Sequence, residues 1–548
     1  GAVSVGGILT IASGSTLDLS TNALSGAALT TSGTGTLKTQ NTTATPLPTG
    51  RTWSMDLQYN SASPQTVVTG TYVNLDISGG NRTLSAGNIN ISGVYTPGAG
   101  VLSVSNNNIN FNGANGQTIP AAQYFDLSSS NNTRILANGV IKIADDFTHG
   151  GGNYTIGTST VEFNGTAGQN IPLLPVASGP NYYHLRCTNT VYCGLPGSVT
   201  IGGDLFSSVA ELRVTNAPGA YVVNVNGNFD VTGGVVNLIG NTTATIIMTV
   251  AGNTTTSGSS KIQMENVNNI TGAAIFQTTD FTTTSTATGI IDFGASGVIA
   301  TGNEFRISGN FSKSGSGSFY TTGTTSATGI VFNKSGTQTF SYTGTASDYT
   351  QYVVNAGSTL QMLTGLPIGT ATAAPASRFT LNGILEMGTN VISGGTNTSN
   401  PTVVTISAGS TMNTANTNGV NSSIITLGTK TYDNGANYIL SGSVAMTNTN
   451  FVNTVMNNLT ISNTAGVTLG GAITVNGNLT FASGGALTTG ANAIGLKGNW
   501  INNGGTLTAS NTVTLDGTSG QSYTNTGTNN FNNLTLNNAA GLTLNNHL

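Results

Sequence analysis

Charged residues are scarce in this chain. Only 14 Lys and Arg and 18 Asp and Glu occur in 548 residues, and charged residues make up 6% of the sequence. The basic residues are spread singly, so the sequence has no basic stripe for nucleic acid and no polybasic membrane patch. No run approaches the roughly 20 apolar residues that a membrane helix needs. We therefore expect neither nucleic acid as a partner nor membrane insertion.

Helix signals are missing as well. No window free of helix breakers has apolar residues at positions i, i+3, i+4 and i+7, and Gly or Asn interrupts nearly every long run. The chain is nevertheless not expected to be disordered, because 37% of its residues are hydrophobic and include regularly spaced β-branched and aromatic types. These features indicate an all-β protein with little or no helix.

Cysteine is nearly absent, and the two that occur, Cys187 and Cys193, lie close together. A close pair in a chain of this composition favours a disulfide that closes a small loop, and two free thiols are the alternative. Further residues that could complete a metal site are not nearby. We therefore predict a possible disulfide between Cys187 and Cys193, and no metal or cofactor.

What the sequence does contain is an internal repeat. A short phrase of alternating apolar and polar residues ends in Asn, or once in Asp, and Gln follows five residues later. The first three copies lie 52 residues apart, and two later copies keep the inner offset. Each copy is typical of a short strand that runs into a turn. The repeated residues are Tyr59, Asn60 and Gln65; Phe111, Asn112 and Gln117; Phe163, Asn164 and Gln169; Phe332, Asn333 and Gln338; and Leu515, Asp516 and Gln521.

A second phrase has the order apolar, any residue, Gly, Asn, apolar. The residues on both sides of Gly-Asn keep the alternation of a strand, so a strand with a bend or bulge fits as well as a hairpin. The copies are 225–229, 307–311, 475–479 and 496–500, with a variant at 201–205.

These short alternating segments predict a parallel β-helix (β-solenoid). One segment of three residues cannot bury enough apolar area alone, but stacking it on its counterpart in the next coil builds a continuous core and pairs the backbone. We predict roughly 20 to 25 coils that run continuously over residues 1–548, with a less regular section at about 240–330 and no separate catalytic domain. An antiparallel β-sandwich array is the alternative, although its repeats would be longer.

Stacking of like positions leads to a prediction about coil length. If a repeat holds a whole number of coils, two coils of about 26 residues explain the spacing of 52, and shorter coils are the alternative. Tyr59, Phe111 and Phe163 would then form an aromatic ladder inside the solenoid. Asn60, Asn112 and Asn164 would form hydrogen bonds along its axis. The repeated residues would thus be structural.

Groups that could perform catalysis are dispersed. The densest acidic group is Asp145 and Asp146, with His149 and Glu162 nearby in the sequence. Catalysis on a β-helix needs several converging carboxylates, so we expect this group to be a solvated turn. No nucleophile elbow, phosphate loop or zinc spacing is present. We predict that the chain is not an enzyme.

The repeats have a counterpart among known proteins. The phrases at 476–481, at 163–165 with Gln169, and at 533–537 resemble those of the very large, adhesin-like surface proteins of Bacteroidetes that the type IX secretion system exports. The resemblance implies a place at the cell surface or in the medium, a role as stalk, filament or adhesin, and the secretion machinery as a partner. It also implies a C-terminal sorting domain, whereas this sequence stops within a repeat and starts without a signal peptide. We expect a fragment or a processed chain.

The sequence thus favours an extracellular structural and adhesive protein. Its uncharged surface of Asn, Thr, Ser and Gly can bind surface glycans or other copies of the chain, end to end or laterally. One alternative is a glycan-binding or glycan-cleaving β-helix, for which Tyr182, Tyr183 and Trp500 are the aromatic residues of interest. A minor alternative is an ice-binding adhesin, since Thr is abundant, but the Thr-rich runs at 254–256 and 282–286 are not expected to recur at coil spacing.

Overall fold

The chain is an all-β, parallel β-solenoid of about 22 stacked coils in a computed structural model. Among the described residues the one helix is the four-residue α1 (Val420–Ser423). No helix of the described residues is long and apolar enough to cross a membrane. Parallel pairing excludes both the β-sandwich and hairpins at the Gly-Asn phrases. The structure describes residues 1–98, 102–103, 105–215, 217–240, 243–266, 272–293, 302–320, 329–344, 351–368, 378–394, 402–425 and 428–546.

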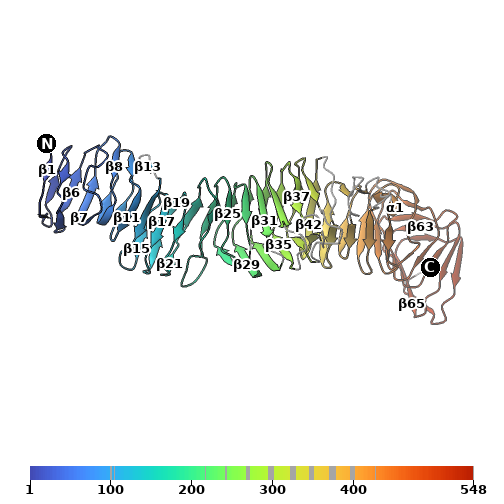
Figure 1. Cartoon of the computed structure of the whole chain (residues 1–548). Coiled ribbons are helices and arrows are strands. Elements are labelled where there is room, and N and C mark those ends of the chain that lie inside the picture. Colours follow the sequence, from blue (N-terminus) through green and yellow to red (C-terminus); the bar gives the residue numbers. More distant parts are fainter. Residues whose placement is uncertain are drawn as a thin grey trace. The chain divides into compact units, whose positions relative to one another are not determined.

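The chain divides into two compact units, which are taken in turn. The first consists of Gly1–Asn216, Tyr221–Asn237 and Thr249–Gly252, and the second of Ala217–Ala220, Leu238–Met248 and Asn253–Leu548. Within each unit, a strand lies beside its counterpart in the neighbouring coil, and the coils follow one another along the chain (Figure 1).

The first unit contains two long series of paired strands and several short ones. One series is β3 (Thr16–Asp18), β6 (Thr36–Thr39), β7 (Arg51–Tyr59), β9 (Gly70–Asp76), β11 (Gly87–Ile91), β14 (Asn107–Phe111), β17 (Asp126–Ser129) and β20 (Phe147–Thr148), with β12 (Tyr95–Thr96) beside β9. The other is β16 (Gln123–Tyr124), β19 (Gly139–Ile143), β22 (Ser159–Phe163), β24 (His184–Cys187), β27 (Leu205–Ser207) and β30 (Phe229–Val231).

Shorter series complete the first unit. They are β1 (Val3–Ser4) with β4 (Leu24–Ser25); β2 (Ile8–Thr10) with β5 (Thr30–Ser32); β8 (Gln65–Val67), β10 (Arg82–Leu84) and β13 (Leu102–Ser103); β15 (Gln117–Ile119), β18 (Arg134–Leu136) and β21 (Tyr154–Thr155); β23 (Gln169–Asn170), β25 (Tyr192–Gly194), β28 (Glu211–Arg213) and β31 (Val235–Ile239); and β26 (Val199–Ile201) with β29 (Gly219–Val225).

The second unit repeats this arrangement. Its longest series is β33 (Thr254–Thr256), β36 (Phe281–Thr283), β39 (Phe311–Lys313), β42 (Gly336–Tyr342), β44 (Ser358–Met362), β47 (Ile384–Glu386), β50 (Thr411–Thr414), β53 (Asn437–Leu440), β56 (Leu459–Ile461), β59 (Leu479–Phe481), β62 (Trp500–Asn502), β65 (Gln521–Asn525) and β68 (Leu542–Leu544). A second series is β32 (Ala244–Val250), β35 (Ala274–Thr278), β38 (Glu304–Ile307), β41 (Gly329–Phe332), β43 (Gln351–Val354), β46 (Arg378–Leu381), β49 (Val403–Ile406) and β52 (Lys430–Tyr432).

The remaining strands of the second unit form four shorter series. They are β34 (Lys261–Glu265), β37 (Thr288–Asp292) and β40 (Ser318–Tyr320); β45 (Leu366–Ile368), β48 (Ile392–Gly394) and β51 (Ile424–Ile425); β54 (Met446–Thr449), β57 (Val467–Leu469), β60 (Ala486–Thr488), β63 (Thr506–Thr508) and β66 (Thr528–Asn530); and β55 (Val455–Met456), β58 (Ile473–Val475), β61 (Ile494–Leu496), β64 (Thr512–Leu515) and β67 (Asn533–Leu536).

Three strands make up one coil where the series are most regular. From β56 to β68 the strands pass through three sheets in a fixed order, and each sheet receives every third strand. Leu459 pairs with Leu479, and Trp500 pairs with both Leu479 and Tyr523, so like positions recur after roughly 20 residues, the length of one coil. These paired side chains point inward and are at most 1% exposed. Thr460, which lies between Leu459 and Ile461 in β56, points outward. This alternation builds the core of each coil.

Coils in these regular parts are shorter than the sequence repeat predicts. In the first unit Leu57 pairs with Leu37 and Leu75, and Ile109 pairs with Ile89 and Leu127, so a coil there also takes roughly 20 residues. A spacing of 52 residues therefore corresponds to about two and two-thirds coils, so a copy of the phrase returns on a different side of the coil. The expectation that a repeat holds a whole number of coils is wrong.

The predicted aromatic ladder is wrong for the same reason. Tyr59 pairs with Thr39, Phe111 with Ile91 and Ser129, and Phe163 with Ile143 and Cys187. All three aromatic side chains are buried, at most 1% exposed, but they lie in separate columns of the stack.

An aromatic ladder does exist in the second unit. Phe281, Phe311 and Phe340 pair in successive strands, and the rings of Phe311 and Phe340 stack with centroids 4.9 Å apart and planes 6° apart. Their coils take about 30 residues, longer than elsewhere, in and beside the section at 240–330 that is predicted to be less regular. Residues 241–242, 267–271, 294–301 and 321–328 of that section lie outside the described residues.

Candidate functional site

A buried glutamine links neighbouring coils in four copies of the repeated phrase. Gln117 Oε1 accepts a hydrogen bond from the backbone nitrogen of Gly113 (2.9 Å), and its Nε2 donates to the carbonyl oxygens of Ile91 (2.7 Å) and Gly93 (2.8 Å). Gln65, Gln169 and Gln521 each make the corresponding three bonds. The glutamine pairs a buried backbone nitrogen and one carbonyl, and it is a second donor to the other carbonyl, which also accepts a backbone hydrogen bond, as Ile91 does from Asn112.

The remaining copy of the phrase is incomplete. Gln338 Oε1 accepts a hydrogen bond from the Lys334 backbone nitrogen (3.2 Å), but its buried Nε2 has no hydrogen-bond partner. Its strand, β42, begins at Gly336, two residues earlier than in the other copies, where Gln is the first residue of its strand. Gln338 is therefore the third residue of its strand and not the first, which changes the position of its side chain relative to the preceding coil.

Two buried arginines, which sequence reasoning missed, also bond backbone carbonyls between coils. Each donates to two carbonyl oxygens of the coil before its own. Arg134 Nη2 donates to the carbonyl oxygens of Phe111 (2.6 Å) and Gly113 (3.3 Å), and Arg82 Nη2 bonds the corresponding two carbonyls of its preceding coil. Burial lowers the pKa of both guanidinium groups. Each arginine pairs with a repeated glutamine of the preceding coil and follows it at the same interval in the sequence, which is the signal that identifies them.

The Gly-Asn phrase forms a corner between two strands. Asn458 Oδ1 accepts a hydrogen bond from the Asn478 backbone nitrogen (2.7 Å), and Asn478 Oδ1 accepts one from Asn499 (3.0 Å), each one coil further on. A Cβ atom on Gly477 would clash with Asn458 Oδ1. Glycine therefore leaves room for the amide of the preceding coil, which explains the order Gly-Asn.

The amide ladder thus forms at the Gly-Asn corners and not at the predicted asparagines. Asn60 Oδ1 is buried without a hydrogen-bond partner, as are Asn333 Oδ1 and Asp516 Oδ1. Asn164 bonds Gln123 (2.9 Å). Among the described side chains, no hydrogen bond joins Asn60 or Asn164 to Asn112. The separate columns of these copies keep their side chains apart.

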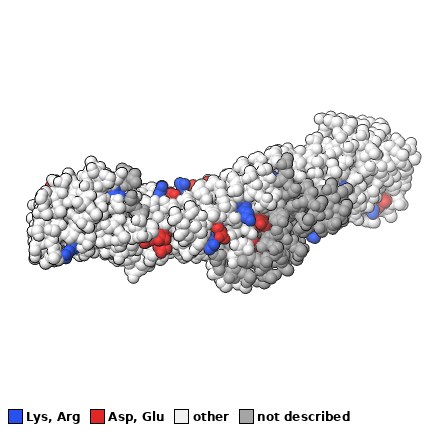
Figure 2. All heavy atoms as spheres, turned by 45° about the horizontal axis from the view of Figure 1, so that its top comes forward, with Lys and Arg blue, Asp and Glu red and all other residues white. Residues whose placement is uncertain are grey.

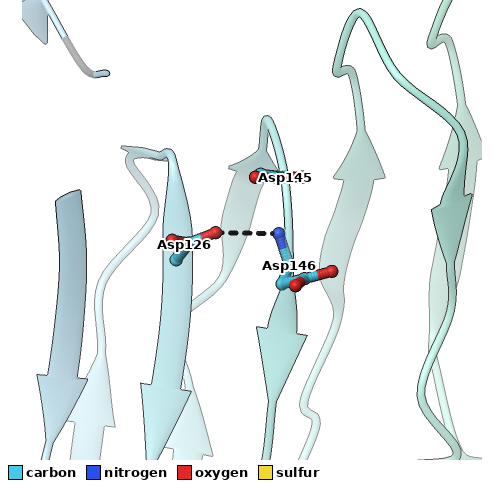
Figure 3. A group of neighbouring side chains, drawn as sticks. All are labelled: Asp126, Asp145 and Asp146. Atoms are coloured by element: carbon cyan, nitrogen blue, oxygen red, sulfur yellow. Dashed lines mark hydrogen bonds between the residues drawn. The ribbon is translucent and has the colours of Figure 1, made fainter. Parts of the chain in front are cut away.

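The acidic group contains a residue that the sequence does not place near it. Asp126, in the preceding coil, lies with Asp145 and Asp146 so that carboxylate oxygens of the three are within 4.8 Å of one another (Figure 3). Asp126 Oδ1 accepts a hydrogen bond from the Asp146 backbone nitrogen (3.0 Å), as the amides do at the Gly-Asn corners. Burial, followed by the charges of Asp126 and Asp146, raises the pKa of Asp145. Asp146 is exposed, as expected for a solvated turn.

Glu162 belongs to a different surface. It lies in β22 between Lys142 and Arg186 of the flanking strands, and its Oε1 accepts a hydrogen bond from the Thr188 hydroxyl (2.9 Å). Sequence reasoning grouped Glu162 with Asp145 and His149 because they are close along the chain. The register instead places Glu162 in a column of outward side chains on another sheet.

Both cysteines are free, so the predicted disulfide is not formed. Cys187 and Cys193 are 0% exposed. Burial, a hydrogen bond with Cys193 and its charge raise the pKa of the Cys187 thiol well above its usual value. The two thiols thus lie in contact inside the core.

The two threonine runs stack on one another in adjacent coils, but the following coil has Ser312 and Lys313 at these positions, so the threonine series ends there. Thr255 pairs with Thr282 and Thr256 with Thr283, and the hydroxyls of Thr256 and Thr283 are 2.7 Å apart. Thr256 and Thr283 are at most 1% exposed. Because these hydroxyls face the core, they cannot order water at the surface.

The aromatic residues of interest divide between core and surface. Tyr182 and Trp500 are buried, whereas Tyr183 is partly exposed. Nearly all aromatic side chains of the described residues are buried. The exceptions, which are partly exposed, are Phe125, Tyr183, Tyr192, Phe206, Tyr221, Phe451 and Phe531. Four of these seven lie between 183 and 221, so the first unit has a concentration of surface aromatics in neighbouring coils.

Two of these four, Tyr183 and Phe206, lie on or directly beside the outer face of β22, β24, β27 and β30, whereas Tyr192 and Tyr221 belong to β25 and β29 of other sheets. Arg186, Phe206 and Asp230 follow Glu162 in one column of paired residues. The Arg186 guanidinium lies over the Phe206 ring, 4.9 Å from its centroid. We call Tyr183, His184, Arg186, Phe206, Glu162 and Asp230 the β24 face. Charged residues are few in the chain as a whole, and most of the described surface in Figure 2 belongs to residues other than Lys, Arg, Asp and Glu.

Comparison with known proteins identifies no relative. No family model matches the chain, and no curated protein or solved structure is significantly similar to it. Function is therefore inferred from the site geometry and from the sequence itself.

Proposed function

We propose that the chain is an extracellular structural and adhesive protein that forms an elongated stalk or filament at the bacterial cell surface. The observation that carries the proposal is the use of its buried polar side chains. Glutamine, arginine and asparagine side chains pair backbone groups of neighbouring coils, as Gln117, Arg134 and Asn478 do. A chain that uses its polar groups in this way is built to hold coils together under load.

The distribution of acids supports a structural role over catalysis. In the described part of the chain, Asp126, Asp145 and Asp146 are the single group of three acidic, His or Cys side chains close enough to share one ion. One member is exposed, and the group sits at a corner of the coil where Asp126 bonds the backbone. The extracellular location rests on the resemblance of the repeats to exported surface proteins.

Partners follow from the same features. Uncharged Asn, Thr, Ser and Gly side chains at the surface offer hydrogen bonds to glycans, and open strand edges at a terminal coil accept another coil, whether from the same polypeptide or from another copy. The resemblance of the repeats to exported surface proteins adds the secretion machinery as a proposed partner.

Labelling of intact cells tests the location and the role together. Antibodies raised against the chain should label unpermeabilised cells of the source organism, and immunogold should mark fibrous material outside the envelope. A strain that lacks the gene should attach less to surfaces, and the gene should restore attachment. Label that appears only after permeabilisation would contradict the proposal.

A further inference from the structure

The arginine of the β24 face differs from the other buried or half-buried arginines. Arg82 and Arg134 bind backbone carbonyls, and Arg213 and Arg306 are paired with Glu211 and Glu304. For Arg186 the structure shows, among the described residues, the Phe206 ring as its contact but no hydrogen bond or ion pair, and its buried Nε has no partner. The stacked ring holds the partly exposed guanidinium in place, with Nε buried against the protein and the terminal Nη groups left to meet a ligand.

Acceptors flank this donor on both sides along the column. Glu162 lies one strand before Arg186, and Asp230 lies two strands after it, with Phe206 between. Neighbouring strands are about 4.8 Å apart, so donor and acceptors are spread over a length of roughly 15 Å. Lys142 precedes Glu162 in the same column, so two cations and two carboxylates alternate along it and their charges balance, which gives a charged ligand no net attraction. A neutral ligand with many hydroxyl groups, which both donate and accept, fits this alternation.

Two rings beside this column are held in fixed positions. His184 Nδ1 accepts a hydrogen bond from the Asp204 backbone nitrogen (2.9 Å), which leaves Nε2 as a donor. The Tyr183 ring packs edge-on against His184, with centroids 4.6 Å apart.

Glycines of the next coil make room for these rings. A Cβ on Gly203 would lie 2.6 Å from His184 Cε1, and a Cβ on Gly202 would lie 2.7 Å from Pro180 and 3.4 Å from the Tyr183 ring. The variant of the Gly-Asn phrase at 201–205 occurs at this coil, with Gly203-Asp204 in place of Gly-Asn. Larger residues there would displace Tyr183 and His184 from the surface.

We propose that the β24 face binds an uncharged polysaccharide. The rings of Tyr183 and Phe206 offer apolar surface to the C–H groups of sugar rings, while Arg186, His184 and Asp230 bind hydroxyls and the buried Glu162, 8% exposed, borders the site. A flat row of donors and acceptors at strand spacing suits an extended chain of sugars more than a single sugar in a pocket. This inference rests on the proposed adhesive function and identifies its ligand class.

Affinity electrophoresis of the whole chain tests the inference. The gels would contain soluble β-1,3-glucan, β-1,4-xylan or α-mannan as neutral probes and polygalacturonate as the anionic probe. At least one neutral probe should retard the wild type more than polygalacturonate does. Arg186→Gln and Tyr183→Ala should each weaken the affinity for that probe about tenfold or more, since each removes a direct contact.

Arg213→Ala is the matched control. Arg213 also stacks on an aromatic ring, that of Tyr192 at 3.9 Å, but it belongs to β28 of another sheet and is paired with Glu211. It should leave retardation unchanged. The inference is overturned if no neutral probe retards the wild type, if polygalacturonate alone does, or if the control loses as much affinity as Arg186→Gln.

The outcome is separable from that of the proposed function. Circular dichroism and hydrogen exchange of residues 199–231 would show that each variant keeps its coils. A variant that reaches the cell surface but no longer binds the probe supports the ligand assignment. A wild type that labels at the cell surface and binds none of the neutral probes contradicts the ligand assignment alone.

Discussion

Gln117 reaches back 26 residues along the chain to donate a hydrogen bond to the carbonyl oxygen of Ile91. The same amide also bonds Gly93 of the preceding coil and accepts a bond from Gly113 of its own turn. One side chain therefore joins a turn to the coil beneath it. Gln65 and Gln169 reach back by the same 26 residues, to Thr39 and Ile143.

Replacement of Gln117 by Ala should destabilise its coil by about 2 to 4 kcal/mol, because the Gly113 N–H and the Gly93 carbonyl would lose their partner inside the core and the Ile91 carbonyl would lose one of its two donors. Repeat proteins open locally, so the effect should be confined to neighbouring coils. Hydrogen exchange of amides in 87–119 measures it.

Gln338→Ala is the control for this experiment. Its amide nitrogen has no partner, and the change removes one bond of 3.2 Å. We expect a loss of about 1 kcal/mol or less. Equal losses at Gln117 and Gln338 would show that the three bonds do not hold the coil.

The sequence predicts the strand pattern well, because alternation is a local property. Triplets such as Leu459-Thr460-Ile461 show inward and outward positions directly, and the structure confirms the parallel β-solenoid with little helix. Coil length is not local. Coil length depends on the lengths of the turns between strands. Because the 52-residue repeat spans about two and two-thirds coils and not a whole number, the repeat does not reveal the coil length.

The candidate site shows the same limit. Glu162 lies near Asp145 in the sequence but pairs with Lys142 and Arg186, whereas Asp126, from the preceding coil, joins Asp145. Only the register between coils reveals such neighbours. Tyr182 is buried, but Tyr183 and His184 are both partly exposed, so strict alternation does not hold at the start of β24 and the sequence pattern alone does not place these rings.

Gly477→Ala should destabilise its corner by about 1 to 3 kcal/mol, because the new Cβ would displace Asn458 Oδ1 and break its bond to the Asn478 nitrogen. Gly495→Ala is the control. A Cβ there would lie 3.6 Å from its nearest neighbour, Thr474 Oγ1, so it should be neutral or slightly stabilising. Urea denaturation followed by hydrogen exchange compares them, and equal effects would contradict the ladder.

The two cysteines should behave as protected thiols. Burial and the neighbouring thiol raise the pKa of Cys187, so little reactive thiolate forms near neutral pH. We expect negligible alkylation of the native chain and two alkyl groups per chain in denaturant without reductant, measured by mass spectrometry. A chain that takes up alkyl groups only after reduction would have the disulfide that this structure lacks.

Asp145→Asn should stabilise the protein at pH 7 but not at pH 3. The pKa of Asp145 is raised in the folded state by burial and by Asp126 and Asp146. The folded state therefore binds its proton more tightly than the unfolded state, and stability falls as pH rises from below the ordinary Asp pKa through the raised one. Thermal melting at both pH values measures the difference.

Salt and a second variant control this prediction. Added salt should reduce the gain at pH 7, since it screens carboxylates at the surface. Asp18→Asn should have little effect at either pH, because an amide oxygen can replace the carboxylate that accepts the Ser20 nitrogen. A gain for Asp145→Asn that persists at pH 3 would argue against charge repulsion.

Stretching single molecules between their two ends tests most directly whether the coils are built to bear load. We predict repeated small force drops, each releasing about one coil, which is roughly 20 residues or about 70 Å of extended chain. Gln117→Ala should lower the force of the corresponding steps. Extension at forces no greater than those that stretch an unfolded polypeptide would contradict a stalk or filament role.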